Sequence, residues 1–275
     1  MRLYAIAVYV FLYAPIAIIV LFSFNAGRHA SEFRGFSVQW YFKALANPFV
    51  TDALMASLTI ATTVAVLSSV FGTAAALALH RIKGPVRTLF DSLIYVAIMV
   101  PGVVLGISTL IALVTLFDAV NPLIAAAWPE GAGQVPKLTL GYGSVIAAHT
   151  LFTMSLVVVI VRARITGMDA SLIEASADLY ATPWGTFRQV TFPLIFPAIL
   201  AGFLLSFTLS FDDFIIAFFV AGPNTTLPIY IFSSIRRGVT PEVNVIGTMV
   251  LVISLILLFT AQFLLQKKAR SDAAR

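Results

Sequence analysis

Long apolar stretches, separated by short polar segments, dominate the pattern of hydrophobic and polar positions along the chain. A helix needs about 20 apolar residues to cross the roughly 30 Å hydrocarbon core of a bilayer. Six stretches meet that length: 3–24, 53–79, 88–117, 141–161, 197–221 and 243–265. The pattern therefore predicts an all-α, polytopic membrane protein with six transmembrane helices in a single domain, residues 1–275.

Composition supports the membrane assignment and removes several other classes. Hydrophobic residues make up 60% of the chain and charged residues only 11%, whereas soluble domains carry about 25% charged residues. The chain has no cysteine, which excludes disulfides and thiolate metal sites. His29, His80 and His149 are scattered without the i, i+4 spacing of paired ligands. We therefore predict no metal site.

The basic residues indicate the orientation of the chain in the membrane. If the N-terminus lies inside, 11 of the 17 lysines and arginines fall in inner segments and 6 in outer segments. Basic residues stay on the cytoplasmic side of a membrane. We therefore expect a bacterial inner (plasma) membrane protein with both termini in the cytoplasm. The outer pair Arg236 and Arg237 runs against this trend. Because the basic residues cluster at the ends of apolar stretches, the net charge of +5 does not indicate a nucleic-acid partner.

The segment 163–193, between the fourth and fifth stretches, is the long inner loop of the chain. Ser171 is suited to cap a first short helix, and Thr182-Pro183 to open a second one. Pro193 and Pro197 are then expected to bound the entry into the fifth span. The loop is either an amphipathic connector lying on the headgroups or a rigid coupling element for a cytoplasmic partner.

The residues of this loop resemble the EAA loop of binding-protein-dependent ABC importer permeases. The family pattern is EAA, three residues, Gly, nine residues and I-x-L-P, and the spacing here is the same. Ser176 and Phe192 are mild departures, whereas Tyr180 stands where the family has Gly. The resemblance implies a type I ABC importer permease fold. It also assigns ATPase coupling to these residues: Glu174, Ala175, Asp178, Leu179, Tyr180, Ala181 and Pro193.

Two adjacent carboxylates, Asp212 and Asp213, lie inside the fifth apolar stretch. An aspartate at the centre of a membrane helix costs about 2.5–3.5 kcal/mol on insertion, which favours a functional role. Neighbouring helix positions point about 100° apart. We therefore expect one carboxylate to face the pathway and the other to pair with a neighbouring helix or cap a local break. The alternative is a structural ion pair with a partner subunit.

The surroundings of the two carboxylates suit a cationic amine, because acidic and aromatic groups both attract a cation. The predicted substrate pathway comprises Asp212, Asp213, Ser206, Ser210 and Phe211. The motifs between residues 205 and 244 resemble the spermidine/putrescine branch of these permeases. The similarity runs over nearly the whole chain, is strongest from Ile173 to Leu258, and is to the second permease subunit. That resemblance implies a homologous permease partner, two copies of an ATP-binding subunit and a periplasmic solute-binding protein received in part by residues 222–244.

The chain contains no G-x-x-x-x-G-K-[ST] motif, the loop that binds nucleotide phosphates. We therefore expect ATP to bind only at a partner subunit, and we expect no cofactor on this chain. No catalytic residues are predicted, and His149 is interpreted as a hydrogen-bonding residue between helices. Two alternatives remain open for the function. One is a permease for another cationic or opine-like solute, and the other is a secondary proton-coupled carrier that uses Asp212 and Asp213 as its relay.

Overall fold

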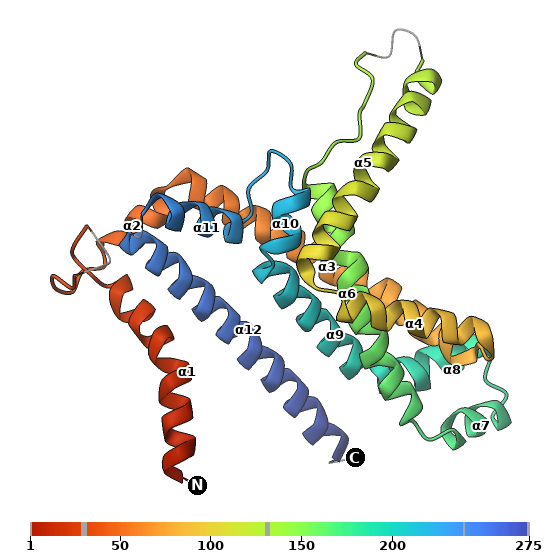
Figure 1. The fold of residues 1–275 in the computed structure, drawn as a ribbon. Coiled ribbons are helices and arrows are strands. Elements are labelled where there is room, and N and C mark those ends of the chain that lie inside the picture. The colour runs from red at the N-terminus through yellow and green to blue at the C-terminus, as the bar shows by residue number, and fades with distance from the viewer. Residues whose placement is uncertain (1, 29–31, 130–132, 239, 274–275) are drawn as a thin grey trace. The chain divides into compact units, whose positions relative to one another are not determined.

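The structure is a computed structural model that describes residues 2–28, 32–129, 133–238 and 240–273. Helices account for nearly all of the regular structure in those ranges (Figure 1). They are α1 (Arg2–Ser23), α2 (Gln39–Ala46), α3 (Pro48–Arg81), α4 (Pro85–Met99), α5 (Gly102–Ala127), α6 (Tyr142–Thr166), α7 (Ser171–Asp178), α8 (Pro183–Thr186), the π-helix η1 (Phe187–Thr191), α9 (Phe192–Asp212), α10 (Ile215–Val220), α11 (Leu227–Arg237) and α12 (Pro241–Ala273).

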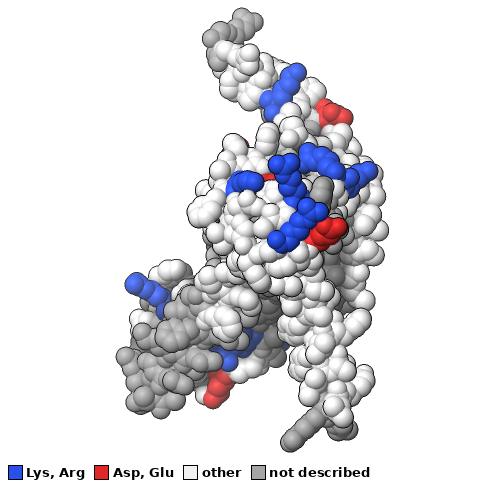
Figure 2. All heavy atoms as spheres, turned by 90° about the vertical axis from the view of Figure 1, so that its left-hand side faces the viewer, with Lys and Arg blue, Asp and Glu red and all other residues white. Residues whose placement is uncertain are grey.

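Five helical segments within the described residues are long and apolar enough to cross a membrane. They are Leu3–Ser23, Pro48–Arg81, Gly102–Ala127, Tyr142–Thr166 and Pro183–Asp212, and a shorter apolar helix covers Pro241–Ile256. Most of the surface shown in Figure 2 is uncharged. This is the surface expected of a chain that faces lipid and other helices.

The third predicted span, 88–117, is wrong as a single helix. The structure divides it into α4 and α5, because Val100 adopts an extended conformation before Pro101. A residue that precedes proline is disfavoured in the helical conformation, which explains the break. Helix α5 continues to Ala127, beyond the predicted end of this span at residue 117.

The fifth predicted span, 197–221, is also interrupted. Helix α9 begins at Phe192, earlier than predicted, and ends at Asp212, before the short helix α10. Pro193 occupies the first turn of α9, which directly continues the π-helix η1. Pro197 lies inside the helix rather than at its boundary. The predicted helix therefore exists, but neither proline marks its start.

Two compact units divide the chain, residues 1–56 with 225–275, and residues 57–224. The proposal of a single domain stays a prediction. In the first unit α1 lies beside α12, and α2 also contacts α12 (Figure 1). Asn47 donates a hydrogen bond of 2.8 Å from Nδ2 to Oε1 of Glu242 and lies 3.2 Å from Tyr230 Oη. These contacts join the start of α3 to α11 and α12.

Small residues allow α3, α6 and α9 to pack closely in the second unit. A Cβ atom added to Gly72 of α3 would lie 2.7 Å from Cβ of Val157, and one added to Gly202 of α9 would lie 3.2 Å from the same side chain. Val157 belongs to a buried apolar cluster that also includes Val161 and Ile195. Membrane helices associate through such close contacts because lipid provides no hydrophobic drive between them.

The contact at Gly72 gives a test of this packing. We expect Gly72→Ala to destabilise the protein by about 1–3 kcal/mol, since the new methyl group overlaps Val157. Gly143→Ala is the matched control, because a Cβ atom at Gly143 meets no atom within 4 Å. The melting temperatures of both variants in detergent would be compared. Equal melting temperatures would contradict the close packing of α3 on α6.

Candidate functional site

The inner loop folds as two short helices that lead into α9. Helix α7 starts at Ser171, but the N-terminal hydrogen bond comes from a different residue than predicted. The backbone N–H of Ser171 donates to Oδ1 of Asp169 over 3.0 Å, and this bond lowers the pKa of the Asp169 carboxyl below its ordinary value. Thr182 caps α8 as predicted, accepting the N–H of Gly185 at 3.1 Å, and Pro183 is the first helical residue. Ser171 is thus the first helical residue of α7 rather than its cap.

Tyr180 adopts a left-handed backbone conformation with a φ of 58°, the one positive φ of a non-glycine residue within the described ranges. Its N–H donates to the carbonyl of Ala177 over 2.9 Å, and the N–H of Ala181 donates to that of Ser176 over 3.1 Å. These two bonds form a Schellman motif, which closes a helix with a left-handed residue. Glycine is preferred at this position, so the structure explains both the family Gly and the strain carried by Tyr180.

The two other departures from the EAA pattern also contribute contacts. The hydroxyl of Ser176 lies 2.9 Å from that of Thr186, and this hydrogen bond joins α7 to α8. Phe192 continues a run of ring contacts from the loop into α9, 6.0 Å from Phe187 and 5.7 Å from Phe196 between ring centroids. The helix pair is therefore fixed to itself and to the membrane helix that follows.

A group of large apolar side chains projects from the turn between α7 and α8 into solvent. The exposed fractions are 81% for Leu179, 96% for Tyr180 and 69% for Trp184. Apolar patches of this kind mark surfaces that bind another protein or a membrane. The turn predicted to couple to the ATPase therefore offers an apolar contact surface.

Arginines at the end of α6 connect the loop region to the other helices. Arg164 donates from Nε to the carbonyl of Leu194 in α9 over 2.9 Å. Arg162 makes an ion pair with Asp91 of α4, and Arg87 lies 3.6 Å from the same carboxylate. A displacement of the start of α9 would therefore be transmitted to α6 through Arg164.

The break between α9 and α10 is built around Asp213. Its Oδ2 atom accepts the backbone N–H groups of Ile216 at 2.9 Å and Ala217 at 3.0 Å. The same oxygen lies 3.2 Å from Nε2 of His149, whose Nδ1 lies 2.8 Å from the hydroxyl of Ser210. His149 therefore joins α6 to both sides of the break. Asp213 fulfils the expectation that one of the two carboxylates caps a local break and contacts a neighbouring helix.

The other predicted pathway residues lie in different environments. Ser206 is fully buried and its hydroxyl has no hydrogen-bond partner in the described part of the chain. Phe211 is buried against Phe207, with ring centroids 5.8 Å apart. Asp212 is exposed, and no ion pair or hydrogen bond of its carboxylate occurs among the described residues. The five residues share one helix and its break, but Asp212 is the member available to a ligand.

Sequence reasoning missed the partnership of His149 with Asp213, and also the bond of Arg164 to α9. His149 precedes Asp213 by 64 positions, and no spacing rule relates residues on separate helices. The positive φ of Tyr180 could have been predicted, because the family pattern has glycine at this position and glycine usually indicates a positive φ.

A family model described as "Binding-protein-dependent transport system inner membrane component" matches residues 68–270. The chain is 33% identical over 267 residues to the spermidine/putrescine transport system permease protein PotC of Escherichia coli (strain K12), covering 97% of this chain and 94% of PotC. It is 37% identical over 270 residues to the putrescine transport system permease protein PotI of the same strain, covering 97% of this chain and 90% of PotI.

Solved structures share the fold at lower identity. A bacterial ABC transporter involved in the import of the acidic polysaccharide alginate aligns over 97% of this chain and 94% of its own, with a TM-score of 0.74 and 16% identity. A structure of bacterial alginate ABC transporter in complex with alginate pentasaccharide-bound periplasmic protein aligns with a TM-score of 0.68 and 15% identity, over 94% of this chain and 92% of that one. With the permease fold, the EAA-type loop and these relatives in agreement, the chain belongs to the family of binding-protein-dependent transport system inner membrane components, as a multi-pass permease subunit of an ABC importer and not an enzyme.

Proposed function

We propose that this permease carries polyamines, spermidine or putrescine, from a periplasmic solute-binding protein into the cytoplasm. The observation that carries the proposal is the exposed, unpaired carboxylate of Asp212 at the break in α9. The permeases PotC and PotI, named for spermidine/putrescine and putrescine transport, support the substrate class because the similarity covers nearly the whole chain.

The chemistry of the break suits a polyamine. A protonated amine gains a charge-assisted hydrogen bond from a carboxylate, and such bonds are about twice as strong as neutral ones. Asp213 already accepts two backbone N–H groups and faces His149, so its charge is engaged within the protein. Asp212 is therefore assigned the substrate contact, while Asp213, Ser210 and His149 position the break around it.

The proposed assembly places this chain beside a homologous permease subunit, two copies of an ATP-binding subunit and a periplasmic solute-binding protein. Both termini and the loop 163–193 lie in the cytoplasm, where the exposed turn at Leu179, Tyr180 and Trp184 meets the ATPase. ATP is bound by that partner and no cofactor by this chain. Residues 222–244 of this chain face the binding protein. Residue 239 in that range lies outside the described residues.

Two alternatives differ in what they require of the same residues. A permease for another cationic amine or an opine-like solute would use Asp212 in the same way, and differ only in the solute that competes for uptake. A secondary proton-coupled carrier would use Asp212 and Asp213 as a relay. That carrier has no need for a rigid helix pair with an exposed apolar turn, which favours the ATP-driven importer.

Uptake of radiolabelled spermidine and putrescine by the whole transporter tests the proposal. We expect Asp212→Asn to reduce uptake at low substrate concentration by about tenfold or more, the loss expected for one hydrogen bond to a charged group. Asp213→Asn should reduce uptake less, because an amide oxygen can still accept the N–H groups of Ile216 and Ala217. Asp118→Asn, an exposed position of α5, should leave uptake unchanged.

Assembly of each variant with the ATPase would be checked by co-purification. Normal uptake by Asp212→Asn would contradict the assignment of that carboxylate to the substrate. If the unmodified transporter moves neither amine but assembles with its ATPase, the substrate class is wrong and the permease assignment stands.

Tyr180 allows the backbone and the ring of the coupling turn to be tested separately. Tyr180→Gly should stabilise the loop by about 1–2 kcal/mol, since a left-handed conformation costs an L-residue about that much. Tyr180→Ala removes the ring and retains the strained backbone. Thermal unfolding of the isolated permease would measure the effect of the backbone strain. ATPase activity stimulated by the loaded binding protein would measure the effect of the ring.

If the ring contacts the ATPase, both variants should lower the stimulated activity to a similar extent, while the melting temperature rises only for Tyr180→Gly. Full stimulated activity in Tyr180→Ala would contradict a role of the ring in coupling. An unchanged melting temperature in Tyr180→Gly would contradict the strain at this turn.

A further inference from the structure

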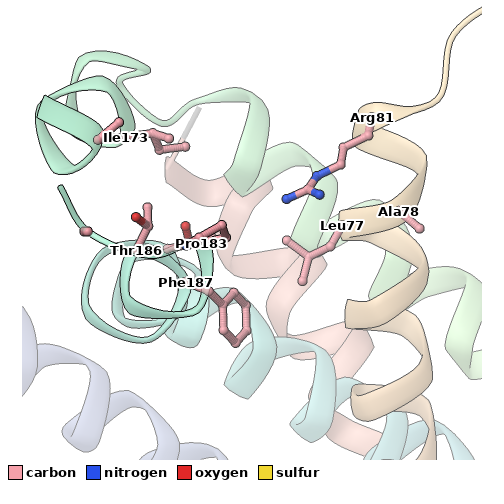
Figure 3. Close-up of a pocket in the computed structure, with 10 residues that line it drawn as sticks. Leu77, Ala78, Arg81, Ile173, Pro183, Thr186 and Phe187 are labelled. Atoms are coloured by element: carbon pink, nitrogen blue, oxygen red, sulfur yellow. The ribbon is translucent and has the colours of Figure 1, made fainter.

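A cavity of about 540 Å³ lies between the end of α3 and the helices of the coupling loop (Figure 3). Its volume is within the range of about 300–1,000 Å³ that small-molecule sites occupy. The lining is mostly apolar and includes Leu77, Ile173, Ala177, Pro183 and Phe187. All of these residues belong to the second unit of the chain. The lining chemistry suits an amphiphile with an apolar portion.

Arg81 supplies the charge at this cavity. It is the last residue of α3, and Figure 3 shows its guanidinium directed into the space beside Ile173 and Pro183. No ion pair of the Arg81 side chain occurs among the described residues, although Glu174 and Asp178 lie on the neighbouring helix α7. The planar fork of an unpaired guanidinium favours an oxyanion that it can contact through two oxygens, such as phosphate.

The cavity lies at the ends of two helical segments that are long and apolar enough to cross a membrane. Arg81 ends the membrane-crossing segment Pro48–Arg81, and Phe187 and Thr191 lie near the start of Pro183–Asp212. On the cytoplasmic orientation proposed above, both ends reach the inner leaflet. Basic pockets between membrane helices on that side bind anionic lipid headgroups, because the leaflet itself is negatively charged.

We propose that this cavity binds the headgroup of an anionic phospholipid, with the phosphate on Arg81 and the upper acyl chain against Leu77 and Phe187. The lipid would contact α3 on one side and α7, α8 and η1 on the other. A bound lipid thus fixes the coupling helices to a membrane helix. Because the contact is independent of the transported solute, the inference does not rest on the polyamine assignment.

The absence of cysteine from the chain allows a direct test on the complete transporter. Leu77→Cys places a single thiol at the cavity lining, on the side of α3 that faces Phe187 and Pro183. The complex would be reconstituted in nanodiscs of phosphatidylcholine, with or without phosphatidylglycerol, and the rate of maleimide labelling measured. We expect phosphatidylglycerol to slow labelling about fivefold, the effect of one basic residue at a membrane surface.

Variants at two neighbouring cations identify the residue responsible. Arg81→Gln should remove the protection, Arg81→Lys should retain part of it, and Lys83→Gln should leave it intact, since Lys83 does not line the cavity. Equal protection in Arg81→Gln and Lys83→Gln would overturn the site. Protection by inorganic phosphate alone would overturn the lipid as occupant, and equally slow labelling in both lipid mixtures would overturn the preference for an anionic lipid. Because maleimide reaches both faces of a nanodisc, labelling does not depend on transport. The lipid site and the polyamine assignment can therefore fail separately.

Discussion

The backbone groups released where α9 stops at Asp212 must be satisfied without bulk water, and this constraint organises the centre of the second unit. Asp213 meets it by accepting two N–H groups from the start of α10. A partly buried carboxylate with these bonds still gains from a polar neighbour on its other side. His149 provides that neighbour from α6 and also contacts Ser210 in the last turn of α9. The break is therefore fixed at both ends by one side chain.

This fixed break separates two carboxylates that are adjacent in sequence. Asp213 is held within the protein, whereas the extended backbone that follows α9 leaves Asp212 exposed. In an uninterrupted helix the pair would only point about 100° apart. The interruption gives the two residues distinct roles, one structural and one available to a cation. The cost of placing acids in a membrane helix is thus offset for Asp213 by its partners, whereas the carboxylate of Asp212 has no such partner among the described residues.

The fold class, the approximate spans and the helix pair of the inner loop could be predicted, because each depends on local pattern. Apolar length predicts a membrane helix, and Thr182-Pro183 predicts a helix start without tertiary information. The exact helix ends at Val100 and Asp212 could not be located because the apolar run continues through both, although Pro101 and the adjacent carboxylates indicated a local break in each stretch. The contacts of His149 and Arg164 could not be predicted from one sequence, since they depend on which helices become neighbours.

The departures of this chain from the EAA pattern are best understood together. Ser176 adds a hydrogen bond between α7 and α8, and Phe192 adds ring contacts to Phe187 and Phe196. Both stiffen the helix pair whose turn carries the strained residue Tyr180. A strained conformation persists only where its surroundings determine it, and these added contacts provide that support. A glycine at the turn would relieve the strain but remove the most exposed ring of the loop, so the tyrosine is consistent with a surface that contacts its partner through the ring.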